Sequence, residues 1–193
     1  MSRKPMISVI GDTHVEEGGV KWNAAESLGE KLVTAGYLIL TGGLGDLPKA
    51  IAKGARKSPN YKDGTLIAIL PGFDPSQAEE HADIAIATGL DEARNLIVAN
   101  SDAVIAIGGG AGTLSEIAYA WSLKRLVIAF DLPGWSQRFA DKKVDERVRY
   151  PEVPEDRVYK VTTAQEALNV LNQYLSKYRR RHSQIQVRKR QDG

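Results

Sequence analysis

The sequence contains no cysteine in its 193 residues and only three histidines. The missing cysteines exclude disulfide bonds, thiolate metal sites and cysteine nucleophiles. The histidines, His14, His81 and His182, do not have metal-ligand spacing, and the run from Glu79 to His81 is typical of a solvated helix end, so no metal site is expected. No apolar run approaches the roughly 18 residues of a membrane span, and the run near the N-terminus is too short for a signal peptide. These absences favour a cytoplasmic protein with no membrane contact.

Positive and negative charges are nearly balanced along the chain except near the C-terminal end. From Gln173 onward the chain has seven Lys or Arg residues and one Asp, whereas the rest is slightly acidic. A basic tail can bind nucleic acid, but no aromatic residue follows Tyr178 to stack on bases, so a nucleic-acid partner is not expected. We expect residues 1–176 to form one Rossmann-like nucleotide-binding domain and residues 177–193 to form a basic C-terminal tail.

Short apolar runs alternate with helical patterns along most of the chain. The runs predict strands over residues 6–10, 37–40, 65–70, 84–87, 103–107, 126–130 and 158–161. Apolar spacing predicts helices over residues 20–32, 47–55, 90–100, 113–123 and 163–178, the last of them opened by a capping box at Thr163 and Glu166. Continuous apolar runs are typical of strands covered on both faces. The chain is therefore predicted to be an α/β protein with a single doubly wound, mainly parallel, Rossmann-like sheet and helices on both faces.

The segment over residues 132–159 departs from this alternation. It contains three prolines and many charges, which predicts loop with one short helical turn, and a loop of this length often serves as a lid or an edge flap. Trp135 in this segment is a candidate to close over a bound base, or it is a packing anchor. Trp121, in the predicted helix 113–123, is expected in the core or in a dimer interface.

A cluster of glycines lies between the run at 103–107 and the helix that follows it. Four of the 18 glycines occupy positions 108, 109, 110 and 112, and such a cluster indicates that something approaches the backbone closely. Ligands bind at the carboxyl ends of parallel strands, and the start of a helix presents free N–H groups to an anion. The cluster therefore predicts a phosphate-binding loop; the alternative is a tight turn with no ligand. The loop residues are Gly108, Gly109, Gly110, Ala111, Gly112 and Thr113, with the Thr113 hydroxyl as a further donor.

Two common phosphate-loop types fit this cluster poorly. A Walker loop requires Gly-Lys-Ser/Thr, but Thr113 follows Gly112 directly and no lysine is present. A dinucleotide fingerprint over Gly110, Gly112 and Ser115 lacks its third glycine, although Asp131 ends the next strand at the expected distance. The dinucleotide-binding interpretation is kept as a minor alternative.

The stretch from Gly109 to Glu116, GGAGTLSE, resembles the PGGxGTxxE signature of the LOG family, the cytokinin-riboside monophosphate phosphoribohydrolases. Gly108 stands where that signature has proline, and Arg94-Asn95 stands where the family has Arg-Lys. The runs SVIG at residues 8–11, LTGG at 40–43 and TGLDEAR at 88–94 look like the DprA/Smf-related branch of the same superfamily, which includes a molybdenum-cofactor carrier protein. The likeness covers roughly residues 5–175.

The resemblance implies a hydrolase that splits a nucleoside 5′-monophosphate into base and ribose 5-phosphate. Arg94 and Glu116 would then be catalytic. Glu116 would hold ribose hydroxyls and stabilise positive charge on the sugar, and Arg94 would bind phosphate or orient Glu116. Taken alone, Glu116 is also typical of a solvated acid in a first helical turn. The remaining wall of the pocket is predicted to come from Gly11, Asp12, Thr13, Gly42, Gly43 and Gly45, with Asp12 and Asp46 as turn formers without a chemical role.

Two functions of different classes follow. The first is a nucleotide-binding protein that hydrolyses the N-glycosidic bond of a nucleoside monophosphate. The second is a non-catalytic carrier of a phosphorylated ligand such as a nucleotide or a molybdopterin-type cofactor. Binding of single-stranded nucleic acid is a minor alternative. No other cofactor is required, and the resemblance implies a homo-oligomer, a dimer or higher.

Overall fold

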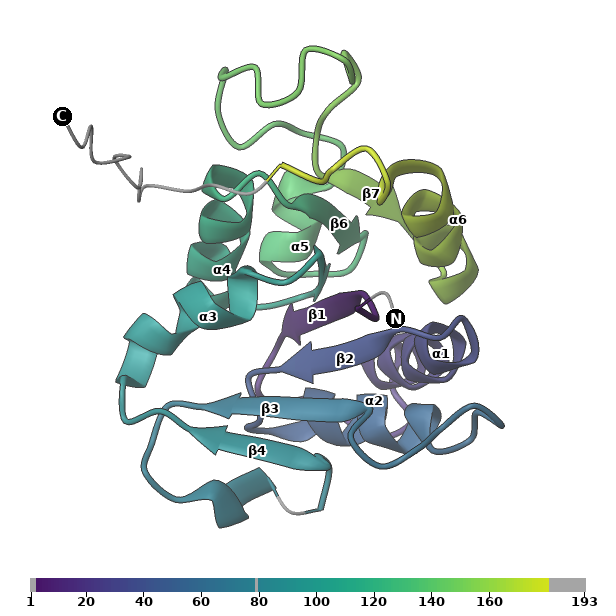
Figure 1. The fold of residues 1–193 in the computed structure, drawn as a ribbon, viewed down its shortest axis with the longest axis vertical. Helices are drawn as coiled ribbons and strands as arrows, with labels where there is room; N and C mark the ends of the chain where they lie inside the picture. The colour runs from purple at the N-terminus through teal and green to yellow at the C-terminus, as the bar shows by residue number, and fades with distance from the viewer. Residues whose placement is uncertain (1–2, 79, 181–193) are drawn as a thin grey trace, which may run out of the picture.

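The computed structural model describes residues 3–78 and 80–180 and contains one sheet of seven parallel strands (Figure 1). Their order across the sheet is β4-β3-β2-β1-β5-β6-β7. The strands are β1 (Met6–Gly11), β2 (Leu38–Thr41), β3 (Leu66–Leu70), β4 (Ile84–Ala87), β5 (Ala103–Ile107), β6 (Leu126–Phe130) and β7 (Tyr159–Val161). This order confirms the predicted doubly wound, Rossmann-like sheet.

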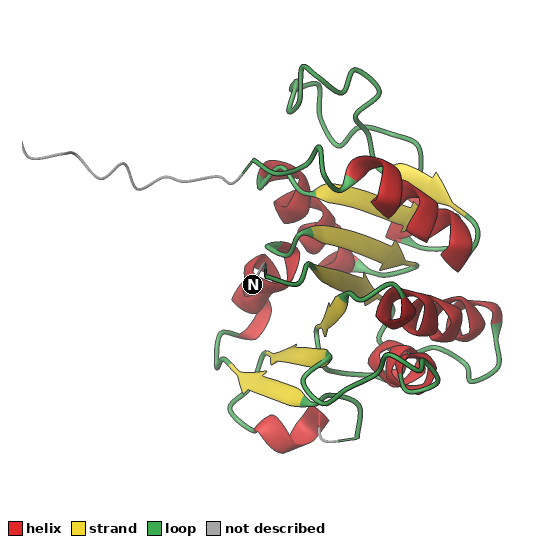
Figure 2. Cartoon of the chain, turned by 45° about the vertical axis from the view of Figure 1, so that its right-hand side comes forward, coloured by secondary structure: helices red, strands yellow, loops and turns green. Residues whose placement is uncertain are grey.

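Helices cover both faces of the sheet (Figure 2). One face packs against α1 (Val20–Thr34), α2 (Asp46–Ala55) and α6 (Ala164–Tyr174). The other packs against α3 (Asn95–Ala99), α4 (Ala111–Ser122) and α5 (Trp135–Phe139). Two 3₁₀ turns complete the structure, η1 (Pro75–Ala78) and η2 (Asp91–Arg94). Within residues 3–78 and 80–180, no helix has the length and apolar character that crossing a membrane requires.

Apart from shifts at the ends of elements, two predicted elements differ from the structure. The helix predicted over 90–100 is split into η2 and the five-residue α3, with Asp91 at a positive φ of 50°. Strand β4 is an edge strand and is not covered on both faces as its apolar run predicts, because Ile84 and Ile86 are 44% and 47% exposed. The reason is that the short α3 packs against α4 near the centre of the sheet and leaves this face of β4 without a helix.

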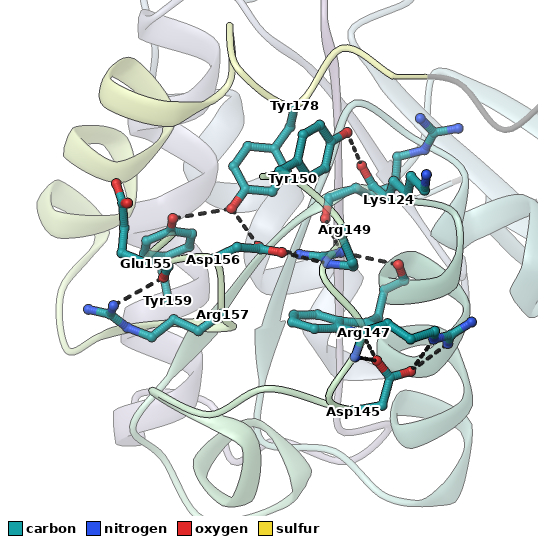
Figure 3. Close-up of polar contacts among 12 residues, drawn as sticks. Lys124, Asp145, Arg147, Arg149, Tyr150, Glu155, Asp156, Arg157, Tyr159 and Tyr178 are labelled. Atoms are coloured by element: carbon teal, nitrogen blue, oxygen red, sulfur yellow. Dashed lines mark hydrogen bonds and ion pairs between the residues drawn. The ribbon is translucent and has the colours of Figure 1, made fainter. Parts of the chain in front are cut away.

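The irregular segment after β6 is held by a buried arginine (Figure 3). Arg149 is 5% exposed, and its guanidinium donates to both carboxylate oxygens of Asp156 at 2.9 and 2.6 Å. It also donates to the carbonyls of Trp121 and Arg125, and it stacks 3.5 Å from the centroid of the Trp121 ring. Tyr178 donates to the same aspartate at 2.6 Å. We call Arg149, Asp156, Trp121 and Tyr178 the Arg149 cluster.

The structure bears on several predictions about Trp121, α6 and the C-terminal end of the chain. Trp121 is 1% exposed and lies in the core, one of the two places predicted for it. The helix predicted to reach residue 178 ends at Tyr174, although Tyr178 is buried in the cluster. The predicted capping box of α6 is present, with Thr163 and Glu166 as its members. Residues 181–193, most of the predicted basic tail, lie outside the described residues.

Candidate active site

The sheet reverses its direction of winding between β1 and β5. From β1 the chain adds strands outward as far as β4, and it then returns to the other side of β1 with β5. Gly11 at the end of β1 pairs with Ile107 at the end of β5, directly before the glycine cluster. The carboxyl edge at such a reversal is where open α/β sheets bind ligands. The glycine cluster therefore lies at the place where this fold favours a ligand.

The first two glycines of the cluster are required by the protein itself. Gly108 and Gly109 have φ values of 67° and 96°, which other residues rarely adopt. A Cβ atom at either position would also lie less than 3.0 Å from protein atoms, the Asp12 carboxylate in one case and the Thr113 side chain in the other. The Gly108 N–H donates to the Ser136 hydroxyl at 2.8 Å and is not available to a ligand. The close approach that the sequence predicts is therefore partly an approach of protein atoms.

The second half of the cluster is open. Gly110 is the N-cap of α4, and a Cβ atom built there would meet nothing within 4 Å. The first helical hydrogen bond runs from the Leu114 N–H to the Gly110 carbonyl at 3.0 Å. The N–H groups of Ala111, Gly112 and Thr113 therefore donate to no described residue, and the positive end of the helix dipole lies among them. We call residues 110–113 the anion cradle.

The Thr113 hydroxyl, which was predicted to donate to a ligand, donates to the protein instead. It donates to the Gly11 carbonyl at 3.1 Å, and this contact ties the anion cradle to the end of β1. In this arrangement the hydroxyl hydrogen is not directed toward a ligand. The backbone N–H groups are the donors that remain.

Arg94 and Glu116 meet beside the anion cradle. The Arg94 Nη1 atom lies 3.5 Å from Oε1 of Glu116, and the two side chains are 15% and 8% exposed. A side chain at Gly42 would collide with this guanidinium, so the glycine makes room for the arginine. The Arg94 Nε is buried and has no partner among the described residues. Burial raises the pKa of Glu116 to about 7; Arg94 opposes this rise, and the negative charge of Glu92 adds to it.

Two adjoining pockets occupy this edge of the sheet. The first, about 440 Å³, contains the anion cradle together with His14 and Asn95. The second, about 340 Å³, is lined by both apolar and charged residues; we call it the ring chamber. The walls of the ring chamber include Leu44, Leu47, Pro48 and Pro71. The two pockets share Gly11, Asp12, Thr13, Glu92, Arg94 and Glu116, so they form one site with two parts.

The predicted wall residues divide into lining and supporting positions. Gly11, Asp12, Thr13 and Gly42 line the site. Gly43 and Gly45 do not line it; they have positive φ values and closely approach β3 side chains and the Thr13 backbone, respectively. Asp46 accepts from the Val15 N–H at 3.2 Å, but it is the first residue of α2 and not part of a turn as predicted.

Three side-chain contacts near the site are not recognised from the sequence. Asp12 forms an ion pair with Lys21 of α1, and both side chains lie against Gly108. Asn95, which replaces the lysine of the LOG signature, donates to Glu92 at 3.0 Å and to Ser115 at 2.9 Å. The Arg94-Asn95 dipeptide is the only signal that points to this network, and Lys21 has none.

The structure also bears on the predictions for His81 and Trp135. His81 is not at a solvated helix end: it is 7% exposed, and its Nε2 lies 2.7 Å from the Gly43 carbonyl, because η1 folds back under the loop that follows β2. Trp135 stacks on Phe139 with ring centroids 5.8 Å apart and lines neither part of the site. Its backbone N–H donates to the Gly109 carbonyl at 3.0 Å, so the packing-anchor interpretation is the one that the structure favours.

Known proteins resemble this chain over most of its length. The model of the SLOG cluster4 family matches residues 4–168. An uncharacterised protein of Archaeoglobus fulgidus is 37% identical over 153 residues, which cover 79% of this chain and 91% of that protein. The structure of the molybdenum cofactor binding protein of Rippkaea orientalis is 30% identical with a TM-score of 0.71, and the match covers 90% of this chain and 98% of that one. The molybdenum cofactor carrier protein of Chlamydomonas reinhardtii is 29% identical with a TM-score of 0.69, over 91% and 99% of the two chains.

Proposed function

Because the chain belongs to the SLOG cluster4 family, we propose that it binds a small phosphorylated ligand in the two-part site and carries it without chemical change. The observation that carries this proposal is the anion cradle, whose three N–H groups have no partner among the described residues and open into the same site as the ring chamber. A phosphoryl group binds at the cradle, and a planar ring lies between the apolar walls of the ring chamber.

The carrier function is preferred to hydrolysis because of the proteins whose structures resemble this one. The similar structures from Rippkaea orientalis and Chlamydomonas reinhardtii are described as binding or carrying the molybdenum cofactor, which is a phosphorylated pterin. Such a ligand has the two parts that the site accommodates. We therefore propose a molybdopterin-type cofactor as the cargo, and a nucleotide as the ligand class that shares its chemistry.

The substitution Gly110→Asp tests the cradle directly. Aspartate is a preferred N-cap residue, and position 110 has room for it, so its carboxylate accepts from the free N–H groups of α4 and takes the place of the phosphate. We expect ligand affinity, measured by calorimetry, to fall at least tenfold while the melting temperature stays equal or rises. Gly110→Ala is the matched control, because it adds a methyl group without charge and should retain most of the affinity. Equal affinity of Gly110→Asp and wild type for nucleoside monophosphates would refute the cradle.

Hydrolysis of a nucleoside monophosphate is the second candidate, and one observation favours it. Glu116 is buried, has a pKa near 7 and lies beside Arg94. An acid side chain in such surroundings is suited to stabilising positive charge on a ribose ring. In that reaction water adds across the N-glycosidic bond and yields the free base and ribose 5-phosphate. Each nucleoside monophosphate is incubated with wild type, Glu116→Ala and Arg94→Ala, and free base is measured by chromatography. Release by wild type alone supports hydrolysis; binding without release by wild type leaves the carrier function.

A further inference from the structure

The elements β4, α3 and α4 present an outer surface that is almost free of charge. Glu116 is the one acidic or basic residue in these three elements, and it is buried in the candidate site. The helices on the opposite side of the sheet differ, since α1, α2 and α6 expose Glu30, Lys49 and Glu166 to solvent. Depletion of charge from an exposed surface is typical of the core of a protein–protein interface.

Large apolar side chains are exposed on the same surface. Ile84 and Ile86 of β4, Leu96 and Ile97 of α3 and Tyr119 of α4 are between 40% and 47% exposed, and we call these five the apolar face. The register partners of the two β4 isoleucines in β3 belong to the core cluster that α3 and α4 cover, so both isoleucines lie on the side of these helices. The apolar face exposes on the order of 400 Å², the size of patch that marks an interaction site on a soluble protein.

The strand at the border of this surface is not protected either. β4 is the outermost strand of the sheet, and no described strand pairs with its outer edge. Its sequence, IAIA, contains neither the charged residues nor the proline with which proteins usually protect an edge strand. The exposed edge and the exposed side chains lie together, so one partner could cover both.

The shape of this side of the sheet fits a second copy of the chain. α3 packs against α4, and the two cover the middle of the sheet, whereas no described helix covers β4. A two-fold rotation brings the outer side of α4 from one copy over β4 of the other, and the same contact then occurs twice. The exposed residues Tyr119 and Ser122 on the outer side of α4 carry no charge, so this helix is suited to covering an apolar strand.

We propose that the apolar face is the interface of a homodimer in which Tyr119 of each copy packs against Ile84 and Ile86 of the other. The area of the face agrees with this assembly. An interface of standard size buries about 800 Å² on each partner, and a little over half of that area is apolar. The apolar face supplies this apolar share, and the polar residues around it form the rim.

Sedimentation of the full chain over a wide range of protein concentrations tests the interface. We expect wild type to be a dimer, and we expect Ile86→Lys and Tyr119→Glu each to raise its dissociation constant about a hundredfold or more, because each places an unpaired charge in the interface. Both positions are exposed in the single chain, so the circular dichroism of the variants should equal that of wild type. Val20→Lys, at a 72% exposed position of α1 on the opposite side of the sheet, is the matched control and should keep the wild-type constant.

A mixture of the two variants tests which residues meet. In the mixed dimer the introduced lysine faces the introduced glutamate across one contact, and the second contact is that of wild type. The mixture should therefore associate at least tenfold more tightly than either variant alone. A mixture that stays monomeric overturns the proposed pairing of α4 with β4. The proposal is also overturned if wild type is monomeric at every concentration, including the case in which the face binds a different protein, or if both variants keep the wild-type dissociation constant.

Discussion

Among the residues that the structure describes, Arg149 and Arg94 each lie beside a buried carboxylate, and the two pairs are built differently. In the Arg149 cluster the guanidinium makes two bonds of 2.9 and 2.6 Å to Asp156, donates to two carbonyls and stacks on a ring (Figure 3). In the candidate site Arg94 makes a single 3.5 Å contact with Glu116, and its Nε has no partner among the described residues.

The difference distinguishes a pair that stabilises the fold from a pair that is available to a ligand. A buried charge costs several kcal/mol unless its hydrogen bonds are satisfied, and the Arg149 cluster satisfies them with protein atoms alone. Arg94 and Glu116 bear a similar cost without full compensation, which leaves donor and acceptor capacity for a ligand. The first pair is therefore expected to stabilise the fold, and the second is expected to destabilise the unliganded protein.

The largest effect should come from breaking the Arg149 cluster. Arg149→Ala leaves the Asp156 carboxylate buried with Tyr178 as its remaining donor, and we expect a loss of about 3–5 kcal/mol in the free energy of unfolding, measured with urea. Arg147→Ala is the matched control, because its exposed pair with Asp145 should contribute less than about 1 kcal/mol. Equal losses in the two variants would contradict the distinction between a saturated buried pair and a surface pair.

The next substitution is expected to raise the free energy of unfolding rather than to lower it. Burial raises the pKa of Glu116 from its ordinary 4.5 to about 7, so between these values the folded state binds more protons than the unfolded state. The stability contributed by this group is therefore complete below about pH 4.5 and is lost as the pH rises to about 7, a difference of about 3 kcal/mol. Glu116→Gln lacks this titration and should be more stable than wild type by about that amount at pH 8, with little difference at pH 4.

Unfolding curves at several pH values check this expectation. The titrations of all other groups are common to both proteins, so the difference between wild type and Glu116→Gln isolates the one carboxyl group. A difference that is constant from pH 4 to 8 would show that Glu116 is not desolvated in the folded state. The same variant should bind a phosphorylated ligand, because the anion cradle consists of backbone groups.

The sequence predicts the parts of this structure that local patterns control. The strands over 84–87, 103–107 and 126–130 agree with the structure to the residue, because each is a continuous apolar run between breakers. The capping box of α6 follows from spacing in the same way, whereas a ligand site beside the glycine cluster stays a prediction. The homo-oligomer implied by the family resemblance stays a prediction.

Long-range pairing is what the patterns miss. Arg149 and Asp156 lie seven residues apart in a segment rich in proline and charge, and nothing in that spacing indicates that both are buried. Lys21 meets Asp12 because α1 starts beside the glycine cluster, and His81 is buried because η1 folds back under the loop after β2. Each of these contacts depends on where the sheet places two distant segments, and that placement has no periodicity to detect.

The smallest stability effect sharpens the comparison within the glycine cluster itself. Gly108→Ala puts a Cβ atom on a backbone of positive φ and against the Asp12 carboxylate, so we expect a loss of about 1–3 kcal/mol in the free energy of unfolding. Gly110→Ala meets open space at a φ of −100° and should change stability by less than about 0.5 kcal/mol. Thermal denaturation of the two variants measures the contrast. If both are equally destabilised, the open half of the loop is constrained by the fold, and its free N–H groups lose their significance as a ligand site.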